Sequence, residues 1–338
     1  MALKPPVEVP QGAIRLNTDS QKLEFFAQDQ WWEMATQVSA GSAPRGWMQN
    51  VNLGTPGTGI QFVDFTTTGD AADWGELTTN GVHAAAGCSS LVRGFAAGGR
   101  LSSGNPWAQQ DTINYWNFST QGNALDFGNL VQAIGRNAGC SDSTRGISGG
   151  GQGSNNMINY WTMSSTGNAI DFGNLTNGRE TVAATSSPTR GIFAGGGNGS
   201  EFNYIDYIIY QTTGDAKDFG DLVSGNTRQM NGNVSSPVRG VFSGGYVSPT
   251  GINTIQYITM ATTGNSVDFG DLSKKSQRGG GFGSSIRGVF AIGYSVPAGV
   301  NAMEYVQIST LGNSTDFGDL YTSISYGCGC SNSHGGLG

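Results

Sequence analysis

The apolar residues of this chain form short runs, and from residue 44 onward the pattern repeats about every 48 residues. One run in each unit mixes β-branched, aromatic and polar residues, as in INYWNF at 113–118 and IQYITM at 255–260. This composition is typical of a strand. A Gly-Asn or Gly-Asp pair follows each run and predicts a tight hairpin turn, because these residues reach positive φ at low cost.

Each unit contains three further strand candidates. The first is a small apolar run that opens with Arg-Gly, such as RGFAAGG at 93–99, and another is a segment of small residues, such as HAAAGCSS at 83–90. The third is an Asp-aromatic-Gly phrase. It occurs as DWGEL at 73–77, DFGNL at 126–130 and 171–175, and DFGDL at 218–222, 268–272 and 316–320. Four strands in each of six units predict an all-β fold, a six-bladed β-propeller.

The order of these phrases resembles the kelch repeat over residues 44–333. The double glycines at 98–99, 149–150, 195–196 and 244–245 carry this resemblance, whereas the Trp of kelch repeats stands only in DWGEL. The resemblance implies that the small-residue segment is the innermost strand of the following blade. The first blade then begins with its second strand at Arg45. Its innermost strand would come from the C-terminal segment 325–333, which we favour, or from Ala40–Pro44, within a propeller spanning residues 44–338.

Every unit also repeats an Arg before Gly and an Asp before the aromatic-Gly phrase. Because a buried guanidinium and a buried carboxylate need each other, we predict that these residues pair within or between blades. The arginines predicted to form these pairs are Arg93, Arg145, Arg190, Arg239 and Arg287, and the aspartates are Asp126, Asp171, Asp218, Asp268 and Asp316. Calcium binding by the aspartates is the alternative, but no loop groups oxygen ligands as an EF-hand loop does.

Two tryptophans and the cysteines raise the question of a ligand or a metal. Trp116 and Trp161 could be sugar platforms, but the aligned residues of the other units are Val or Ile, which predicts a core position. Cys88, Cys140 and Cys330 occupy equivalent places in three small-residue segments. Since no CxxC pair is present, we predict buried thiols and no metal.

No catalytic arrangement stands out. Asp-Phe-Gly holds magnesium in protein kinases, but a catalytic aspartate is needed once and no H-R-D loop is present. Ser/His/Asp, HExxH and P-loop arrangements are also absent. A propeller enzyme acting on glycans would need paired carboxylates, and the variable loops contain few acids. We therefore expect a protein that is not an enzyme and needs no cofactor.

Two kinds of segment differ in every unit: the one after the double glycine and the one after the Asp-aromatic-Gly phrase. In a four-stranded blade alternate loops emerge on the same face, so both variable sets share one face. Diversified loops on a rigid scaffold are typical of binding surfaces, although loops without a function also diverge. Aromatic residues among polar ones suit a glycan or a protein. The candidate ligand-binding residues are Trp107, Phe202, Tyr246 and Tyr294.

Composition and charge narrow the class of partner. The formal net charge is −7 with only 17 Lys and Arg and no basic run, which disfavours nucleic acid. No stretch is long and apolar enough for a transmembrane helix, and the start of the chain lacks the apolar segment of a signal peptide. We expect no membrane insertion and no export by that route.

Residues 1–43 do not repeat and predict a small β-meander, with AIRLN and KLEFF around a TDSQ turn and WWEM after a second turn. The segment resembles one common in structural and fibre proteins of tailed bacteriophages. The matching residues are Gly12, Ile14, Arg15, Asn17, Thr18, Asp19, Lys22, Leu23, Glu24, Phe25 and Trp31. The resemblance implies a virion protein, assembled in the host cytoplasm, whose N-terminal module docks on other virion proteins. The candidate docking residues are Ile14, Arg15, Leu23, Phe25, Trp31 and Trp32.

These features together predict a phage virion protein of the tail fibre or adhesin type, homo-oligomeric on the particle. Its propeller would present one face to a host-surface glycan or protein. The alternative is a capsid or tail decoration or connector protein with a purely structural role.

Overall fold

The computed structural model describes residues 10, 12–17, 22–27, 30–33, 44–49, 58–78, 82–101, 108–230 and 232–337. The chain divides into two compact units, Met1–Ser42 and Ala43–Gly338. The first unit is a three-stranded antiparallel sheet of β1 (Ile14–Asn17), β2 (Lys22–Ala27) and β3 (Gln30–Glu33), which is the predicted meander. Its register places Phe25 opposite both Ile14 and Trp32.

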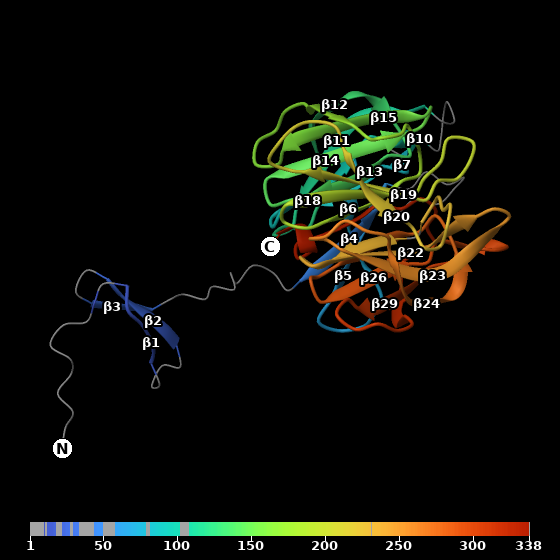
Figure 1. The fold of residues 1–338 in the computed structure, drawn as a ribbon. Coiled ribbons are helices and arrows are strands. Elements are labelled where there is room, and N and C mark those ends of the chain that lie inside the picture. Colours follow the sequence, from blue (N-terminus) through green and yellow to red (C-terminus); the bar gives the residue numbers. More distant parts are fainter. Residues whose placement is uncertain are drawn as a thin grey trace, which may run out of the picture. The chain divides into compact units, whose positions relative to one another are not determined.

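The second unit is a six-bladed β-propeller, which confirms the predicted fold class. Each blade is a four-stranded antiparallel sheet, and the blades follow one another in chain order (Figure 1). From the innermost strand outward, blade 1 contains β31 (Gly329–Ser331), β4 (Arg45–Gln49), β5 (Gly59–Asp64) and β6 (Ala72–Glu76), and blade 2 contains β8 (Ala86–Ser89), β9 (Arg93–Ala97), β11 (Gln110–Asn117) and β12 (Leu125–Ile134). Blade 3 contains β13 (Ala138–Ser141), β14 (Arg145–Gly151), β15 (Asn155–Thr162) and β16 (Ile170–Asn174), and blade 4 contains β17 (Ala183–Ser186), β18 (Arg190–Ala194), β19 (Tyr204–Ile209) and β20 (Lys217–Asp221). Blade 5 contains β21 (Gly232–Ser235), β22 (Arg239–Val247), β23 (Thr250–Thr259) and β24 (Val267–Ser276), and blade 6 contains β25 (Gly280–Gly283), β26 (Arg287–Ala291), β29 (Ala302–Gln307) and β30 (Thr315–Asp319).

The C-terminal segment supplies the innermost strand of blade 1. In β31, Cys330 pairs with Trp47 and Ser331 with Gly46 of β4, so one sheet joins the two ends of the propeller sequence. Because β31 completes the first blade, the ring is closed by main-chain hydrogen bonds as well as by side-chain packing.

The hydrophobic core lies between neighbouring blades. Trp116 of blade 2 is buried in one cluster with Trp47 and Trp74 of blade 1. Trp161 of blade 3 is buried in another cluster with Phe95 of blade 2. Both Trp116 and Trp161 are therefore packing residues between blades, as their aligned Val and Ile residues predict.

The Asp-aromatic-Gly phrase holds each blade to the hairpin turn of the next. A Cβ at Gly128 of blade 2 would lie 2.4 Å from the carbonyl oxygen of Gly167, in the Gly-Asn turn of blade 3. The amide of Gly167 donates to the carbonyl of Phe127 at 2.9 Å, and Asn168 Oδ1 accepts from the amide of Asn129 at 3.0 Å. The phrase needs glycine because two backbones meet there. The same side-chain bond recurs at Asn123, Asp215, Asn265, Asn313 and Asp70.

The predicted pairing of repeated arginines with repeated aspartates is wrong. The Arg93 guanidinium lies 5.0 Å from the ring centroid of Tyr115 and donates to the carbonyl of Met163 in the next blade at 3.1 Å. Asp126 is exposed, and no ion pair among the described residues joins the two sets. The physical reason is distance: β11 separates β9 from β12 by two strand spacings, roughly 10 Å, and its tyrosine occupies the space between. Arg145, Arg190, Arg239 and Arg287 stack and donate in the same way, and Asp171, Asp218, Asp268 and Asp316 are likewise exposed.

Candidate ligand-binding site at one end of the central channel

The two sets of variable segments meet on one face of the propeller, which we name the loop face. In four blades the segment that leads into the innermost strand pairs with the segment that follows the second strand. These pairs are Arg100 with His83, in strands β10 (Arg100–Leu101) and β7 (Val82–His83), and Glu180 with Gly197, Arg228 with Tyr246 and Gln277 with Tyr294. At these four places the loop face is held together by backbone hydrogen bonds.

Six residues, one per blade, surround the axis at the centre of the loop face, and we name them the mouth ring. They are Ala84, Arg136, Thr181, Gln229, Arg278 and Tyr326, all with φ between 53° and 62°. Each amide donates to the carbonyl of the preceding member, at distances from 2.6 to 3.3 Å, and Ala84 closes the circle by donating to Tyr326. A left-handed conformation is uncommon for residues with a side chain and persists when its surroundings impose it. Here the closed circle of hydrogen bonds imposes it.

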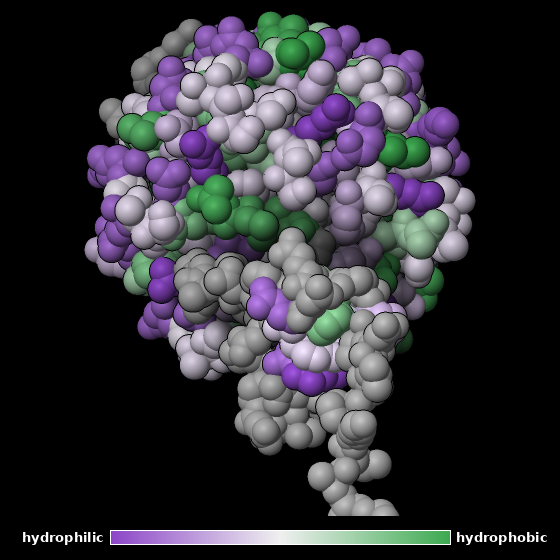
Figure 2. Space-filling model, turned by 90° about the vertical axis from the view of Figure 1, so that its left-hand side faces the viewer, coloured by the Kyte–Doolittle hydropathy of each residue, from purple (hydrophilic) through white to green (hydrophobic). Residues whose placement is uncertain are grey.

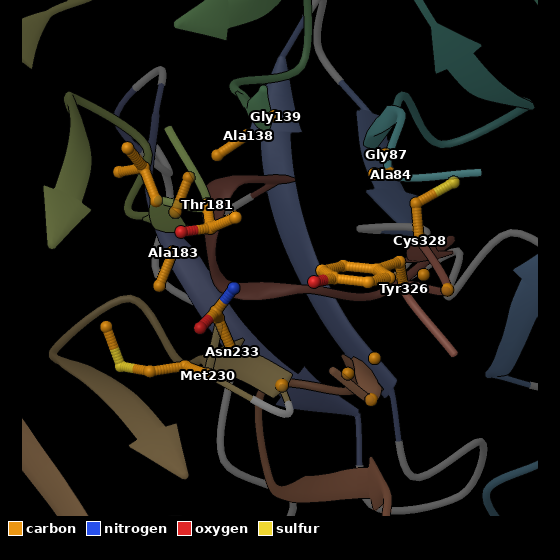
Figure 3. A pocket seen from close by; sticks show the side chains of 18 of the residues that line it. Ala84, Gly87, Ala138, Gly139, Thr181, Ala183, Met230, Asn233, Tyr326 and Cys328 are labelled. Carbon is orange, nitrogen blue, oxygen red and sulfur yellow. The ribbon is translucent and has the colours of Figure 1, made fainter. Parts of the chain in front are cut away.

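A cavity of about 120 Å³ lies within the mouth ring and extends down the central channel. Its walls are the small residues of the innermost strands, such as Gly87, Gly139 and Ala183, with Asn233 among them (Figure 3). The hydroxyl of Tyr326 points into the cavity toward the side that carries Thr181 and Asn233 (Figure 3). The cavity therefore offers polar groups on an otherwise small-residue wall.

Four arginines and two glutamates set the charge of the mouth. Arg136 pairs with Glu180, and Arg228 Nε lies 3.2 Å from Glu201 Oε1. Arg100 is buried close to Arg136, and its pKa is lowered by burial first and by the neighbouring cation second. With four arginines and two glutamates, the described residues of the mouth have a net positive charge, although the protein as a whole is acidic.

Arg278 differs from the other arginines of the mouth. Its Nε donates to Gln229 Oε1 at 2.8 Å, and its guanidinium lies 5.6 Å from the ring centroid of Tyr294 and 5.1 Å from that of Tyr326. Its partners are thus an amide and two aromatic rings. No carboxylate among the described residues neutralises it.

The opposite end of the channel is occupied by the chain itself, in the segment His334–Leu337, which we name the C-terminal cap. It ends in the 3₁₀-helix η1 (Gly335–Leu337). Nε2 of His334 lies 3.3 Å from Ser141 Oγ and 3.2 Å from the carbonyl oxygen of Ser89. Burial lowers the pKa of His334 to about 4, so the imidazole is neutral at pH 7. A Cβ at Gly336 would meet the carbonyl oxygen of Ser141, so the cap fits closely.

Two of the predicted ligand-binding residues, Tyr246 and Tyr294, contact arginines of the mouth. Tyr246 and Tyr294 are half-buried on the loop face beneath Arg228 and Arg278. Phe202 stacks on Tyr204 with ring centroids 5.2 Å apart. Trp107 lies outside the described residues. Among the predicted residues that the structure describes, Tyr294 is the one that contacts a member of the mouth ring, Arg278.

The polar members of the mouth ring were not anticipated from the sequence. Their segments look like featureless runs of small residues, as in RNAGC at 136–140 and YGCGC at 326–330. A signal was nevertheless present. At one aligned position the units carry Ala, Arg, Thr, Gln, Arg and Tyr, next to positions that hold only small residues.

The predicted docking residues of the N-terminal unit have different environments. Ile14 is 64% exposed. Arg15 Nη2 lies 2.7 Å from Glu24 Oε2, and the guanidinium lies 4.1 Å from the centroid of Trp31, so Arg15 and Trp31 hold the sheet together. The side chains of Leu23, Phe25 and Trp32 lie outside the described residues.

The cysteines are buried free thiols. Burial raises the pKa of Cys140 and of Cys328 to about 12 and raises those of Cys88 and Cys330 as well. They are protonated at pH 7, and a metal ligand would need to be a thiolate. Across the described part of the chain, no group of His, Cys, Asp or Glu side chains is arranged to hold a metal ion.

Comparison with protein-family models gave no match, and neither did comparison with curated protein sequences. No helix within the described ranges is both long and apolar enough to cross a membrane.

Proposed function

We propose that this chain is a bacteriophage virion protein of the tail fibre or adhesin type, whose loop face binds a glycan or a protein of the host surface. The observation that carries the proposal is the mouth ring. One backbone conformation occurs six times around the axis, and it carries side chains of five chemical types. A regular scaffold with diversified side chains is the usual construction of a binding surface. The C-terminal cap lies at the opposite end of the channel, where His334 contacts Ser141 and Ser89.

The N-terminal sequence supports attachment to a particle. Its Gly-x-Ile-Arg-x-Asn-Thr-Asp pattern resembles segments of phage structural proteins, and the propeller repeats resemble kelch repeats. A sheet of this size buries little apolar surface alone, so packing on another virion protein would stabilise it. The exposed Ile14 offers an apolar contact for such a partner. We expect each particle to carry several copies of the chain.

Immunogold electron microscopy of particles that carry this chain tests the proposal. Label at the distal end of the tail, together with binding of the purified full-length chain to host cells, is the expected result. Label distributed over the capsid lattice would overturn the adhesin role. A well-folded sample that fails to bind host cells would also count against it.

A structural decoration or connector role is the second candidate, and one observation favours it. The turns between the first and second strands of three blades expose apolar side chains on the face opposite the loop face. These are Leu91, Val92, Val238 and Ile286, each 58–67% exposed. Figure 2 shows apolar residues in green among hydrophilic ones in purple, on the left-hand side of the molecule as drawn in Figure 1. Apolar turns of this kind suit permanent contact with another subunit.

A further inference from the structure

The mouth of the channel has features that specify a ligand class, and the inference drawn from them rests on the proposed binding role of the loop face. We propose that the mouth binds an acidic sugar residue. Arg278 holds the carboxylate of the sugar, and the hydroxyl groups of the sugar enter the cavity inside the mouth ring.

Arg278 is held in place before any ligand arrives. Gln229 Oε1 fixes its Nε, and the rings of Tyr294 and Tyr326 fix its guanidinium. Its Nη atoms donate no hydrogen bond to any described residue, and the side chain is half-buried at the edge of the cavity. The N–H groups of a planar guanidinium match the two oxygens of a carboxylate. Because the side chain is already ordered, binding loses little conformational entropy.

The charge of the mouth favours an anion. Arg136 stands three positions from Arg278 in the six-membered mouth ring and therefore on the other side of the axis. Glu180 pairs with Arg136 and Glu201 pairs with Arg228, whereas Arg278 has no such partner among the described residues. An unneutralised cation beside a narrow cavity attracts anions, even though the formal net charge of the protein is −7.

The cavity favours a sugar over a simple anion. The Oδ1 atom of Asn233, which lines the cavity, is buried and accepts no hydrogen bond in the described structure. Leaving a buried acceptor unpaired costs about 1–3 kcal/mol, and a sugar hydroxyl is a donor that also accepts, for example from Tyr326. By the same measure, a single water needs about 10–15 Å³. The cavity of about 120 Å³ therefore has room for one sugar residue but not for a folded peptide.

The class of ligand can be tested with the full-length chain on an array of immobilised oligosaccharides. The probes are glucuronate and galacturonate oligomers, with the glucose and galactose oligomers of equal length as neutral counterparts. We expect binding to the acidic probes at least tenfold tighter than to the neutral ones, and weaker as sodium chloride is raised from about 50 to 500 mM. Inorganic phosphate as a soluble competitor separates sugar recognition from simple anion binding.

Three variants assign the effect to Arg278. Arg278→Gln removes the charge and is expected to weaken binding to uronate probes by about 10- to 100-fold, in line with a charge-assisted hydrogen bond. Arg278→Lys keeps the charge without the planar fork and should lose less. Lys275→Gln removes one positive charge from an exposed position at the end of β24 and should bind as the parent does. Thermal unfolding of each variant shows whether the propeller is intact.

The outcomes separate this inference from the proposed function. Binding to acidic probes that survives Arg278→Gln, or a preference for neutral probes, overturns the inference while leaving a binding loop face. The inference is also overturned if inorganic phosphate displaces the uronate probes at the same concentration as free glucuronate does. The sugar hydroxyls would then contribute nothing to binding. A chain that binds no glycan but still binds host cells refutes the acidic sugar and retains the adhesin role. A folded chain that binds neither refutes both.

Discussion

Asp70 Oδ1 accepts a hydrogen bond of 2.9 Å from the backbone amide of Asp319, and this bond joins the first blade to the sixth across 249 residues. The amide of Gly69 also donates to the carbonyl of Phe317 at 2.8 Å. The same two kinds of bond also join all the remaining pairs of neighbouring blades. Ring closure therefore uses the repeated junction, and β31 adds a shared sheet to it.

Gly128→Ala should destabilise the propeller far more than Gly122→Ala. Both glycines have φ near +150°, but a Cβ at Gly128 would lie 2.4 Å from a backbone oxygen, whereas a Cβ at Gly122 meets nothing within 4 Å. We expect a loss of about 1 kcal/mol at Gly122 from the backbone conformation alone. At Gly128 we expect about 3 kcal/mol or more, because two blades must separate. Urea unfolding measures both, and equal losses would contradict this account of the junction.

Removal of residues 325–338 should open the ring. The truncation deletes β31, and it uncovers Trp47 and Met48, which are 0% and 1% exposed in the intact protein. Burying each of these side chains contributes about 1.5–3 kcal/mol. We therefore expect a large drop in Tm and a red shift of tryptophan fluorescence. Truncation after Ser333 retains β31 and serves as the control, and equal Tm values for the two truncations would show that β31 does not close the ring.

The stability of the propeller should depend on the protonation of His334. Its folded pKa is about 4, below the ordinary value of 6.5, so the unfolded chain binds the proton more readily. The stability that the neutral imidazole contributes is complete above pH 6.5. It is lost as pH falls from about 6.5 to 4, by at most about 1.4 kcal/mol per pH unit. Comparing Tm at pH 7.5 and 4.5 for the parent and for His334→Asn measures this. A parent that loses no more stability than the variant would refute the role of the imidazole.

Arg179 and Asp206 form a fully buried ion pair, with Nη1 and Oδ2 2.9 Å apart and side chains 0% and 1% exposed. Arg179→Met leaves a buried carboxylate without its cation and should cost about 3–5 kcal/mol. Adding Asp206→Asn removes that charge, so the double variant should recover part of the loss. Chemical denaturation of the single and double variants tests this, and a double variant less stable than Arg179→Met would contradict it.

Much of the scaffold follows from sequence alone, for local physical reasons. Strand composition and Gly-Asx turns can be recognised from a few neighbouring residues. Their repetition predicts six blades that follow one another in chain order. The apolar residues that all six units carry at the positions of Trp116 and Trp161 correctly predict packing between blades. The local signals are strong because each unit buries its strands in the same way.

The partners of the repeated polar residues were decided by tertiary structure. An Arg and an Asp equivalent to Arg93 and Asp126 recur in every unit, but the sequence does not show that the guanidinium stacks on the ring of Tyr115 or that the Asp faces solvent. The six members of the mouth ring are spread over some 240 residues and acquire a common environment only when the blades close around the axis. Arg278 becomes a candidate anion-binding group because Gln229, Tyr294 and Tyr326 surround it, and those contacts come from three different blades.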